Sequence, residues 1–240
     1  MDPEDSLPLA FVIVGSAASV VLYLSPIPLI IAIVRSGAVG MARPDSFIIG
    51  VSYSLANGAY PAITGQLVPV ITSSIALLLY SVYLTLFLVF AGDKRRQFLV
   101  RWVLFFLFSM VVLFSGPVVV WSIQPDYLKP VGGVQYFVSM WFGVCACVAN
   151  ILLLSGQMTS IRQVVRDRDS SSIDGIMLAG GTLCSLCWTT YGCLILDPFY
   201  MTGTITGDIV CFVQIFVKVY FRKQKCITSN PAAQVTAGDI

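Results

Sequence analysis

One ionisable side chain, Asp208, lies deep inside an apolar stretch of the sequence. The stretch covers residues 186–214 and also carries the indole of Trp188 and the hydroxyl of Thr204. A charged group at bilayer depth is costly, and it usually marks a solute path, a proton path or a buried polar contact. Three roles for Asp208 are therefore open. It binds substrate hydroxyls, it couples movement of a solute to a proton, or it makes a structural hydrogen bond to a neighbouring helix.

The composition places these groups in a membrane protein. Of the 240 residues 57% are hydrophobic and 11% are charged, and the mean hydropathy is +0.87. Soluble domains carry about 25% charged residues. We therefore expect a polytopic membrane protein in contact with the lipid bilayer, without a large soluble domain and without a nucleic-acid partner.

Enzyme chemistry has little support in this sequence. There is no His, which excludes His-based triads and HExxH zinc sites. The seven Cys lie mostly in apolar runs and do not form a four-ligand metal pattern. An intramembrane aspartyl protease needs two membrane carboxylates, and only Asp208 qualifies. We expect no catalytic residue, no metal and no cofactor, and hence no enzyme.

A membrane span needs about 20 apolar residues, and the chain contains seven such runs. They cover residues 8–33, 46–64, 67–91, 98–121, 132–158, 174–194 and 200–221, and the polar tail 222–240 is expected to be disordered. With seven spans, Lys129 is the only one of the 14 basic residues in a connection on the opposite side from the rest. The positive-inside rule then places the N-terminus outside and the C-terminus in the cytosol. The plasma membrane is the expected location.

The chain also repeats itself at an offset of 131 residues. At this offset Tyr60 coincides with Tyr191 and Gly50 with Gly181. Three spans reverse the chain direction, and one further span restores it. The sequence therefore predicts two parallel three-helix repeats, 8–91 and 132–221, joined by a linker helix at 98–121. This is an all-α membrane fold of seven helices in a 3+1+3 arrangement.

The same offset pairs four polar or aromatic side chains inside the spans. Asn57 coincides with Trp188, and Ser73 coincides with Thr204, so the four are expected at similar depth. Hydroxyl and amide groups with an aromatic platform suit a sugar, which offers hydroxyls and an apolar ring face. Packing between membrane helices uses the same residue types and is the alternative reading. Asp208 has no acidic counterpart, because the offset leads to Leu77.

Two motifs resemble the SWEET (MtN3/saliva) sugar transporters of the PQ-loop superfamily. The first unit contains Ser25-Pro26-Ile27-Pro28, and the second contains Cys187-Trp188-Thr189-Thr190-Tyr191-Gly192 followed by Asp197, Gly207 and Gln214. The resemblance implies facilitative transport of a mono- or disaccharide by alternating access, and it makes a homo-oligomer an expectation. It also departs from the family. The family's two pocket asparagines fall on Ser73 and Thr204, and its first tryptophan falls on Asn57.

From these motifs we expect a substrate site and a set of moving parts. The substrate site comprises Asn57, Ser73, Trp188, Thr204 and Asp208. The hinge and gating residues are Pro26, Pro28, Pro44, Tyr60 and Tyr191, and the second unit lacks the proline hinges that the first unit keeps. The alternative is a proton-coupled PQ-loop carrier of an amino acid or similar small solute that uses Asp208. A seven-span receptor is disfavoured by the internal repeat and the short loops.

Overall fold

The computed structural model describes residues 3–39, 45–123, 133–168, 173 and 175–229, and over these residues it is helical throughout. The predicted all-α fold class is confirmed. The helices are α1 (Pro3–Leu24), α2 (Ile27–Ser36), α3 (Asp45–Thr64), α4 (Leu67–Phe90), α5 (Asp93–Ile123), α6 (Gly133–Asp167), α7 (Gly175–Leu194) and α8 (Pro198–Ser229).

Four helical stretches among the described residues are long and apolar enough to cross a membrane. They are Ser6–Ser36, Leu67–Phe90, Gly133–Leu154 and Pro198–Phe221. The predicted runs at 46–64, 98–121 and 174–194 coincide with α3, α5 and α7, which do not meet the same criterion in the part of the chain described. The number of seven spans therefore stays a prediction, although each predicted run forms a helix.

The first predicted span is broken into α1 and α2 at Ser25 and Pro26. Pro26 has no backbone N–H, so it cannot continue the hydrogen-bond ladder of α1. The N–H of Ser25 instead donates to the carbonyl of Leu22 at 3.1 Å, and the carbonyl of Pro26 accepts from Ile30 at 3.0 Å as α2 begins. Pro28 lies in the first turn of α2, where a missing N–H has little cost. Both prolines therefore lie at a real bend in the chain.

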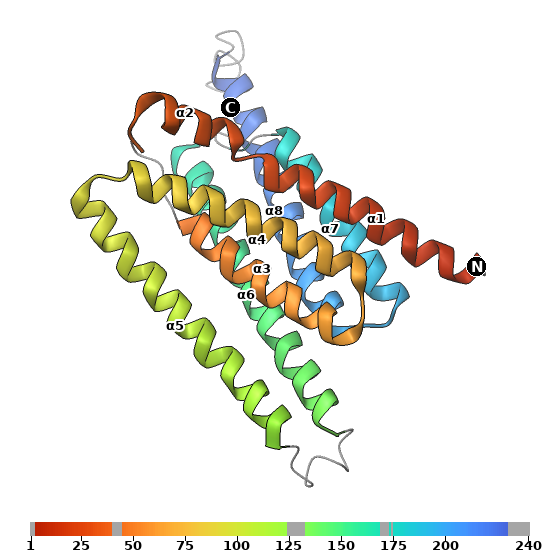
Figure 1. The fold of residues 1–240 in the computed structure, drawn as a ribbon. Helices are drawn as coiled ribbons and strands as arrows, with labels where there is room; N and C mark the ends of the chain where they lie inside the picture. Colours follow the sequence, from red (N-terminus) through yellow and green to blue (C-terminus); the bar gives the residue numbers. More distant parts are fainter. Residues whose placement is uncertain (1–2, 40–44, 124–132, 169–172, 174, 230–240) are drawn as a thin grey trace.

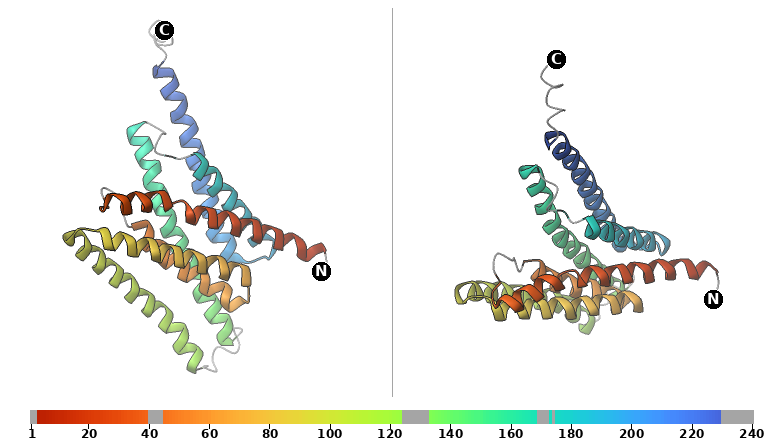
Figure 2. Two further views of the ribbon diagram at one scale, coloured as in Figure 1. Left: turned by 45° about the horizontal axis from the view of Figure 1, so that its top comes forward. Right: turned by 90° about the horizontal axis from the view of Figure 1, so that it is seen from above.

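Each group of three helices packs in the same order. α4 lies between α1 and α3, and α8 lies between α6 and α7. The two groups meet where α3 contacts α6 and where α1 contacts α7. In the right view of Figure 2, α6 and α8 rise away from the layer that contains α1, α3 and α4. We call α1–α4 the first helix set and α6–α8 the second helix set.

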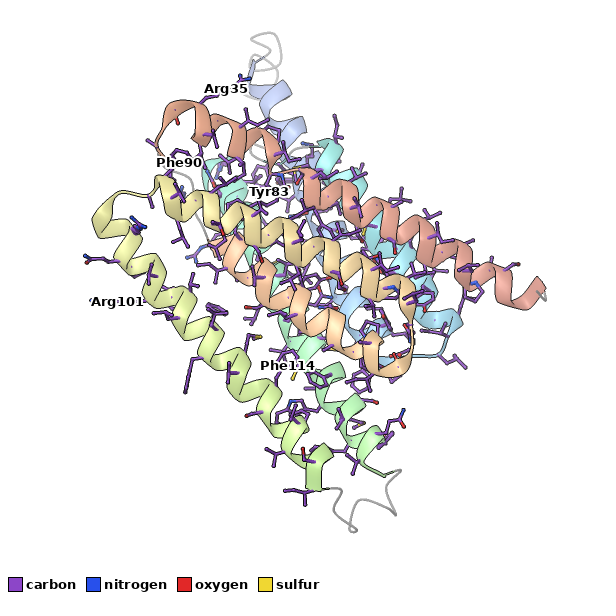
Figure 3. All side chains as sticks on the ribbon, viewed as in Figure 1. Arg35, Tyr83, Phe90, Arg101 and Phe114 are labelled. Atoms are coloured by element: carbon purple, nitrogen blue, oxygen red, sulfur yellow. The ribbon has the colours of Figure 1, made fainter. Side chains whose placement is uncertain are left out.

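The fifth helix, α5, stands at the margin of the molecule, as Figure 1 shows. Its contacts with α6, α3 and α4 are sparse. One of them joins Phe114 to Phe142 of α6, with ring centroids 4.9 Å apart, and Phe114 is labelled in Figure 3. α5 therefore connects the two helix sets from outside rather than forming part of either.

The two hydrophobic cores of the sets correspond at the predicted offset. One core surrounds Phe87, which is fully buried, and contains Ile30, Ile33 and Phe47. The other contains Ile161, Val164 and Leu178. These are the positions 131 residues after Ile30, Ile33 and Phe47 respectively.

The last helix runs farther than the sequence predicts. α8 continues to Ser229, past residue 221 where the last span was expected to end. The remaining predicted tail, 230–240, lies outside the described residues, as does Pro44.

Candidate solute site between the two helix sets

A cavity of about 580 Å³ lies between the two helix sets. All six helices at its walls, α1, α3, α4, α6, α7 and α8, contribute lining residues. No charged side chain lines it among the residues described. Its polar lining consists mainly of hydroxyl and amide groups from Ser19, Asn57, Ser73, Asn150, Ser185, Thr204 and Gln214.

Many lining residues occur in pairs separated by 131 positions. The two helix sets therefore present equivalent positions to the same space, as the repeat in the sequence leads one to expect. The pairs are Ser19 with Asn150, Leu22 with Leu153, Tyr23 with Leu154, Phe47 with Leu178, Tyr53 with Cys184, Asn57 with Trp188, Pro69 with Tyr200, Thr72 with Gly203, Ser73 with Thr204 and Tyr80 with Cys211.

Four of the five residues predicted to bind substrate line this cavity. Asn57, Ser73, Trp188 and Thr204 reach it from α3, α4, α7 and α8. Asn57 donates one amide N–H to the carbonyl of Tyr53 at 3.1 Å, which leaves its carboxamide oxygen as an acceptor. Thr204 donates its hydroxyl to the carbonyl of Tyr200 at 2.7 Å, so its oxygen can accept from a solute.

Trp188 is held on two sides. Its indole N–H donates to the hydroxyl oxygen of Ser19 on α1 at 3.0 Å, and Ser19 in turn donates to the carbonyl of Gly15 at 2.8 Å. One face of the indole is stacked on Tyr200, with ring centroids 6.0 Å apart and planes inclined by 5°. A solute therefore meets a fixed aromatic surface whose polar edge is already occupied.

One end of the cavity is closed by a polar and aromatic cluster. The hydroxyl of Tyr60 donates to Oδ2 of Asp197 at 2.6 Å, and the hydroxyl of Tyr191 donates to Oε1 of Gln66 at 3.2 Å. The Tyr60 ring also contacts the ring of Phe199 at 5.4 Å between centroids. Both predicted gating tyrosines thus take part in contacts that join α3 and the α3–α4 turn to the second helix set.

Asp197 has a second task at this end. Its Oδ1 accepts from the backbone N–H groups of Phe199 at 2.9 Å and Tyr200 at 3.2 Å. These are donors at the start of α8 that have no partner within the helix, so the carboxylate caps the helix. The cap fixes the carboxylate where Tyr60 can reach it. Asp197 was part of the family motif in the sequence, but nothing there indicated its contact with Tyr60.

Known proteins resemble this chain over most of its length. A family model described as "Sugar efflux transporter for intercellular exchange" matches residues 140–226. The bidirectional sugar transporter SWEET7 of Arabidopsis thaliana is 22% identical over 222 residues, which is 91% of this chain and 82% of that protein. The sugar transporter SWEET1 of Drosophila pseudoobscura pseudoobscura is 24% identical over 165 residues, or 68% of this chain and 66% of that one.

The fold agrees with these matches. A solved structure of a eukaryotic SWEET transporter superposes with a TM-score of 0.79 at 18% identity, covering 92% of this chain and all of the other. The chain belongs to the SWEET family. It is an integral membrane protein with the helical architecture that the motifs predicted.

This SWEET-family chain keeps Asp208 away from the cavity. Asp208 is only 8% exposed and lies between α8 and α7, where Thr189 donates its hydroxyl to Oδ2 at 2.6 Å. Its other oxygen, Oδ1, is buried without a hydrogen-bond partner in the part of the chain described. Asp208 is not among the lining residues. The geometry therefore separates it from the other four predicted substrate residues.

The sequence reasoning missed Asn150. It lines the cavity from α6 and donates its amide N–H to the carbonyl of Gly203 at 2.7 Å. Its counterpart at the 131-residue offset is Ser19, which holds Trp188. Extending the comparison of the two repeats to their first helices would have brought both residues out. Of the predicted hinges, Pro26 lines the cavity at the α1–α2 bend.

Proposed function

We propose that this chain carries a sugar across a membrane by facilitative alternating access, without coupling to protons. The supporting observation is an uncharged cavity between two similarly built helix sets, closed at one end by the contact of Tyr60 with Asp197. Relatives named as bidirectional sugar transporters agree with this proposal.

The lining suits a neutral, hydroxyl-rich solute. Acceptors come from Asn57 and Thr204, Ser73 adds a hydroxyl, and Trp188 offers an aromatic face. A cavity of about 580 Å³ lies within the range of about 300–1,000 Å³ for small-molecule sites. It accommodates a mono- or disaccharide. A charged amino acid would leave its ammonium and carboxylate groups without a charged partner, which is costly in a dry site.

Alternating access would follow from movement of one helix set against the other. Residues 8–91 and 132–221 form the two moving repeats in this proposal, and 98–121 joins them, as in transporters built from parallel repeats. Opening the closed end requires the Tyr60–Asp197 and Tyr191–Gln66 hydrogen bonds to break. The bend at Pro26 and Pro28, and Pro44 before α3, are the proposed hinges.

The proton-coupled alternative required Asp208 to meet the solute. Because Asp208 contacts Thr189 outside the cavity, no observation favours that alternative. We assign Asp208 the third of its predicted roles, a structural hydrogen bond between α7 and α8.

We further propose that the protein resides in the plasma membrane with its N-terminus outside and its C-terminus in the cytosol. The distribution of basic residues supports this orientation. The Tyr60–Asp197 end of the cavity then faces outward. A homo-oligomer is part of the same proposal, on the strength of the family resemblance alone.

Uptake of radiolabelled sugars into proteoliposomes tests the function. Native chain and Asp208→Asn should both take up a sugar equally with and without an imposed pH gradient. Sugar uptake that requires the gradient, or pH-driven uptake of amino acids with no sugar uptake, would contradict the proposal.

A further inference from the structure

A second cavity, of about 730 Å³, lies between α3, α5 and α6, outside the solute site. We call it the lateral groove. Its lining residues come mostly from α6 and are almost all apolar. They are Ile49, Ser52, Tyr53, Ala56, Phe106, Met110, Gly133, Tyr136, Phe137, Met140, Trp141, Val144, Cys145, Val148, Ala149 and Leu152.

The lateral groove follows from the way α5 is attached. Near its start, Val103 and Phe106 pack against the core cluster that contains Phe87. Farther along, Phe114 contacts Phe142 of α6 at 4.9 Å between ring centroids. Met110 lies between these two attachments and lines the groove. Because α5 is held on both sides of Met110, the groove is a defined feature of the fold.

Water does not fill such a space. No charged side chain lines it, and the hydroxyl of Ser52 already donates to the carbonyl of Ile48 in its own helix at 3.4 Å. Apolar cavities of this kind stay dry and take up apolar ligands. An empty space of this size would forfeit the dispersion contacts that close packing normally provides. An apolar occupant is therefore required.

The dimensions select the occupant. From Gly133 to Leu152 the groove follows α6 for about 28 Å at 1.5 Å per residue, close to the roughly 30 Å of the hydrocarbon core. A helix from a second copy is about 10 Å wide with its side chains, too large for about 730 Å³ over this length. A sterol would bring a hydroxyl for which the apolar lining offers little. A flexible hydrocarbon chain meets both constraints.

The chain offers a complementary charge for a lipid headgroup. α5 begins at Asp93, and Lys94, Arg95 and Arg96 follow at once. Basic residues at the cytosolic end of a membrane helix attract lipid phosphates. On its outer side α5 presents Phe108 and Val111, which are 68% and 67% exposed, so the bilayer surrounds this helix.

We propose that the lateral groove binds an acyl chain of a membrane phospholipid, with the phosphate at the basic start of α5. Tyr53 lines both the groove and the solute cavity. The bound chain is therefore separated from the solute path by a single aromatic ring and supports the wall formed by α3 and α6. The proposal rests on membrane insertion alone and stands independently of which solute is carried.

Photolabelling of the full chain in phosphatidylcholine vesicles tests this proposal. The vesicles contain a trace of phosphatidylcholine with a diazirine in the middle of one acyl chain, and the labelled residues are identified by mass spectrometry. We expect label on Met110 and on residues 144–152 of α6. Val148→Trp should fill the groove and reduce the Met110 label to background.

A matched substitution on the same helix controls for general effects. Ile151 is 51% exposed, Val148 is 52% exposed, and only Val148 lines the groove. Ile151→Trp should leave the Met110 label unchanged. Met110→Trp fills the groove from the opposite wall and should remove the label from Val144, which guards against misfolding of one variant. Size-exclusion profiles report folding of each.

Three results would overturn the proposal. The first is equal Met110 labelling in the native chain, Val148→Trp and Ile151→Trp. The second is labelling by a photoactivatable sterol without labelling by the acyl probe. The third is complete disulfide formation between Cys145 and Met110→Cys in vesicles, because it would show that α5 closes onto α6 and leaves no room for a chain.

Discussion

The hydroxyl of Tyr60 donates to Oδ2 of Asp197 at 2.6 Å, which joins residues 137 positions apart in the chain. This contact closes the cavity at one end. The same carboxylate caps α8 through Phe199 and Tyr200, so the closure depends on a rigid helix start. The positions of the two groups explain how a small rotation of one helix set opens or closes the path.

Removing the hydroxyl of Tyr60 should open this end more often. A hydrogen bond to a charged group contributes about 1.5–3 kcal/mol, so Tyr60→Phe should raise the open fraction by roughly one to two orders of magnitude. Cys147 lines the cavity and contacts the carbonyl of Phe199, so it serves as a native reporter. An impermeant thiol reagent on the Tyr60 side should modify Cys147 faster in Tyr60→Phe.

Tyr191→Phe is the milder comparison, since its bond to Gln66 at 3.2 Å joins two neutral groups and contributes about 1 kcal/mol. The account of the gate fails if Tyr60→Phe leaves the rate of Cys147 modification unchanged.

The hydroxyl of Thr204 should contribute to solute affinity. Thr204→Val keeps the shape but removes the acceptor, and one lost hydrogen bond of about 1 kcal/mol corresponds to roughly a five-fold rise in KM. Thr206→Val is the matched control, because Thr206 makes the same type of bond to its own helix and does not line the cavity. Equal KM values for both variants would remove Thr204 from the site.

The contact of Ser19 with Trp188 should matter for the aromatic platform. Ser19→Ala leaves the indole N–H in a half-buried site without its acceptor, which costs about 1–3 kcal/mol. We expect a higher KM for sugar, because the ring becomes free to leave its stacked position on Tyr200. Trp188→Phe retains an aromatic face without the N–H and should bind better than Trp188→Ala. Equal uptake by the three variants would mean that the ring does not contact the solute.

The structural role of Asp208 predicts a stability effect rather than a transport effect. Thr189→Val removes the only described donor to the carboxyl and should lower the free energy of unfolding by about 1–3 kcal/mol. Asp208→Asn retains an acceptor and should be better tolerated. Thermal unfolding in detergent measures both. If Asp208→Asn instead abolishes uptake without changing stability, Asp208 belongs to the transport mechanism.

Close packing at Gly50 gives a test of the fold. A Cβ on Gly50 would lie 2.7 Å from the ring of Tyr80, whereas a Cβ on Gly181, its counterpart at the 131-residue offset, would have nothing within 4 Å. Gly50→Ala should therefore lower stability by about 1–3 kcal/mol. Gly181→Ala should be neutral or slightly stabilising, because alanine favours the helix. The reverse order in thermal unfolding would contradict the packing of α3 on α4.

Sequence reasoning predicted the fold well where a repeated pattern carries the information. The offset of 131 residues brought Asn57, Ser73, Trp188 and Thr204 together, and the structure places all four on one cavity. It worked because helices of equal length and order put equivalent positions at equal depth. The position of Asp208 depends instead on which face of α8 meets α7, and apolar residues surround α8 on all sides in the sequence. No periodicity was left to indicate that face.

Contacts between the two helix sets were also beyond sequence reasoning. Tyr60 and Asp197 lie in different sets, and their approach depends on how the sets are inclined to each other. The groove beside α5 depends on sparse contacts such as Phe114 with Phe142, which leave no pattern in the linker sequence. By contrast, the break at Pro26 was predictable, because a missing N–H interrupts a helix wherever it occurs.

Sugar counterflow in proteoliposomes tests the central claim most directly. Vesicles are loaded with unlabelled sugar and diluted into a trace of the same labelled sugar at equal pH on both sides. The account predicts transient accumulation of label by the native chain and by Asp208→Asn, and little accumulation by Trp188→Ala. Absence of counterflow for every mono- and disaccharide tested, with folded protein in the vesicles, would contradict a sugar carrier that works by alternating access.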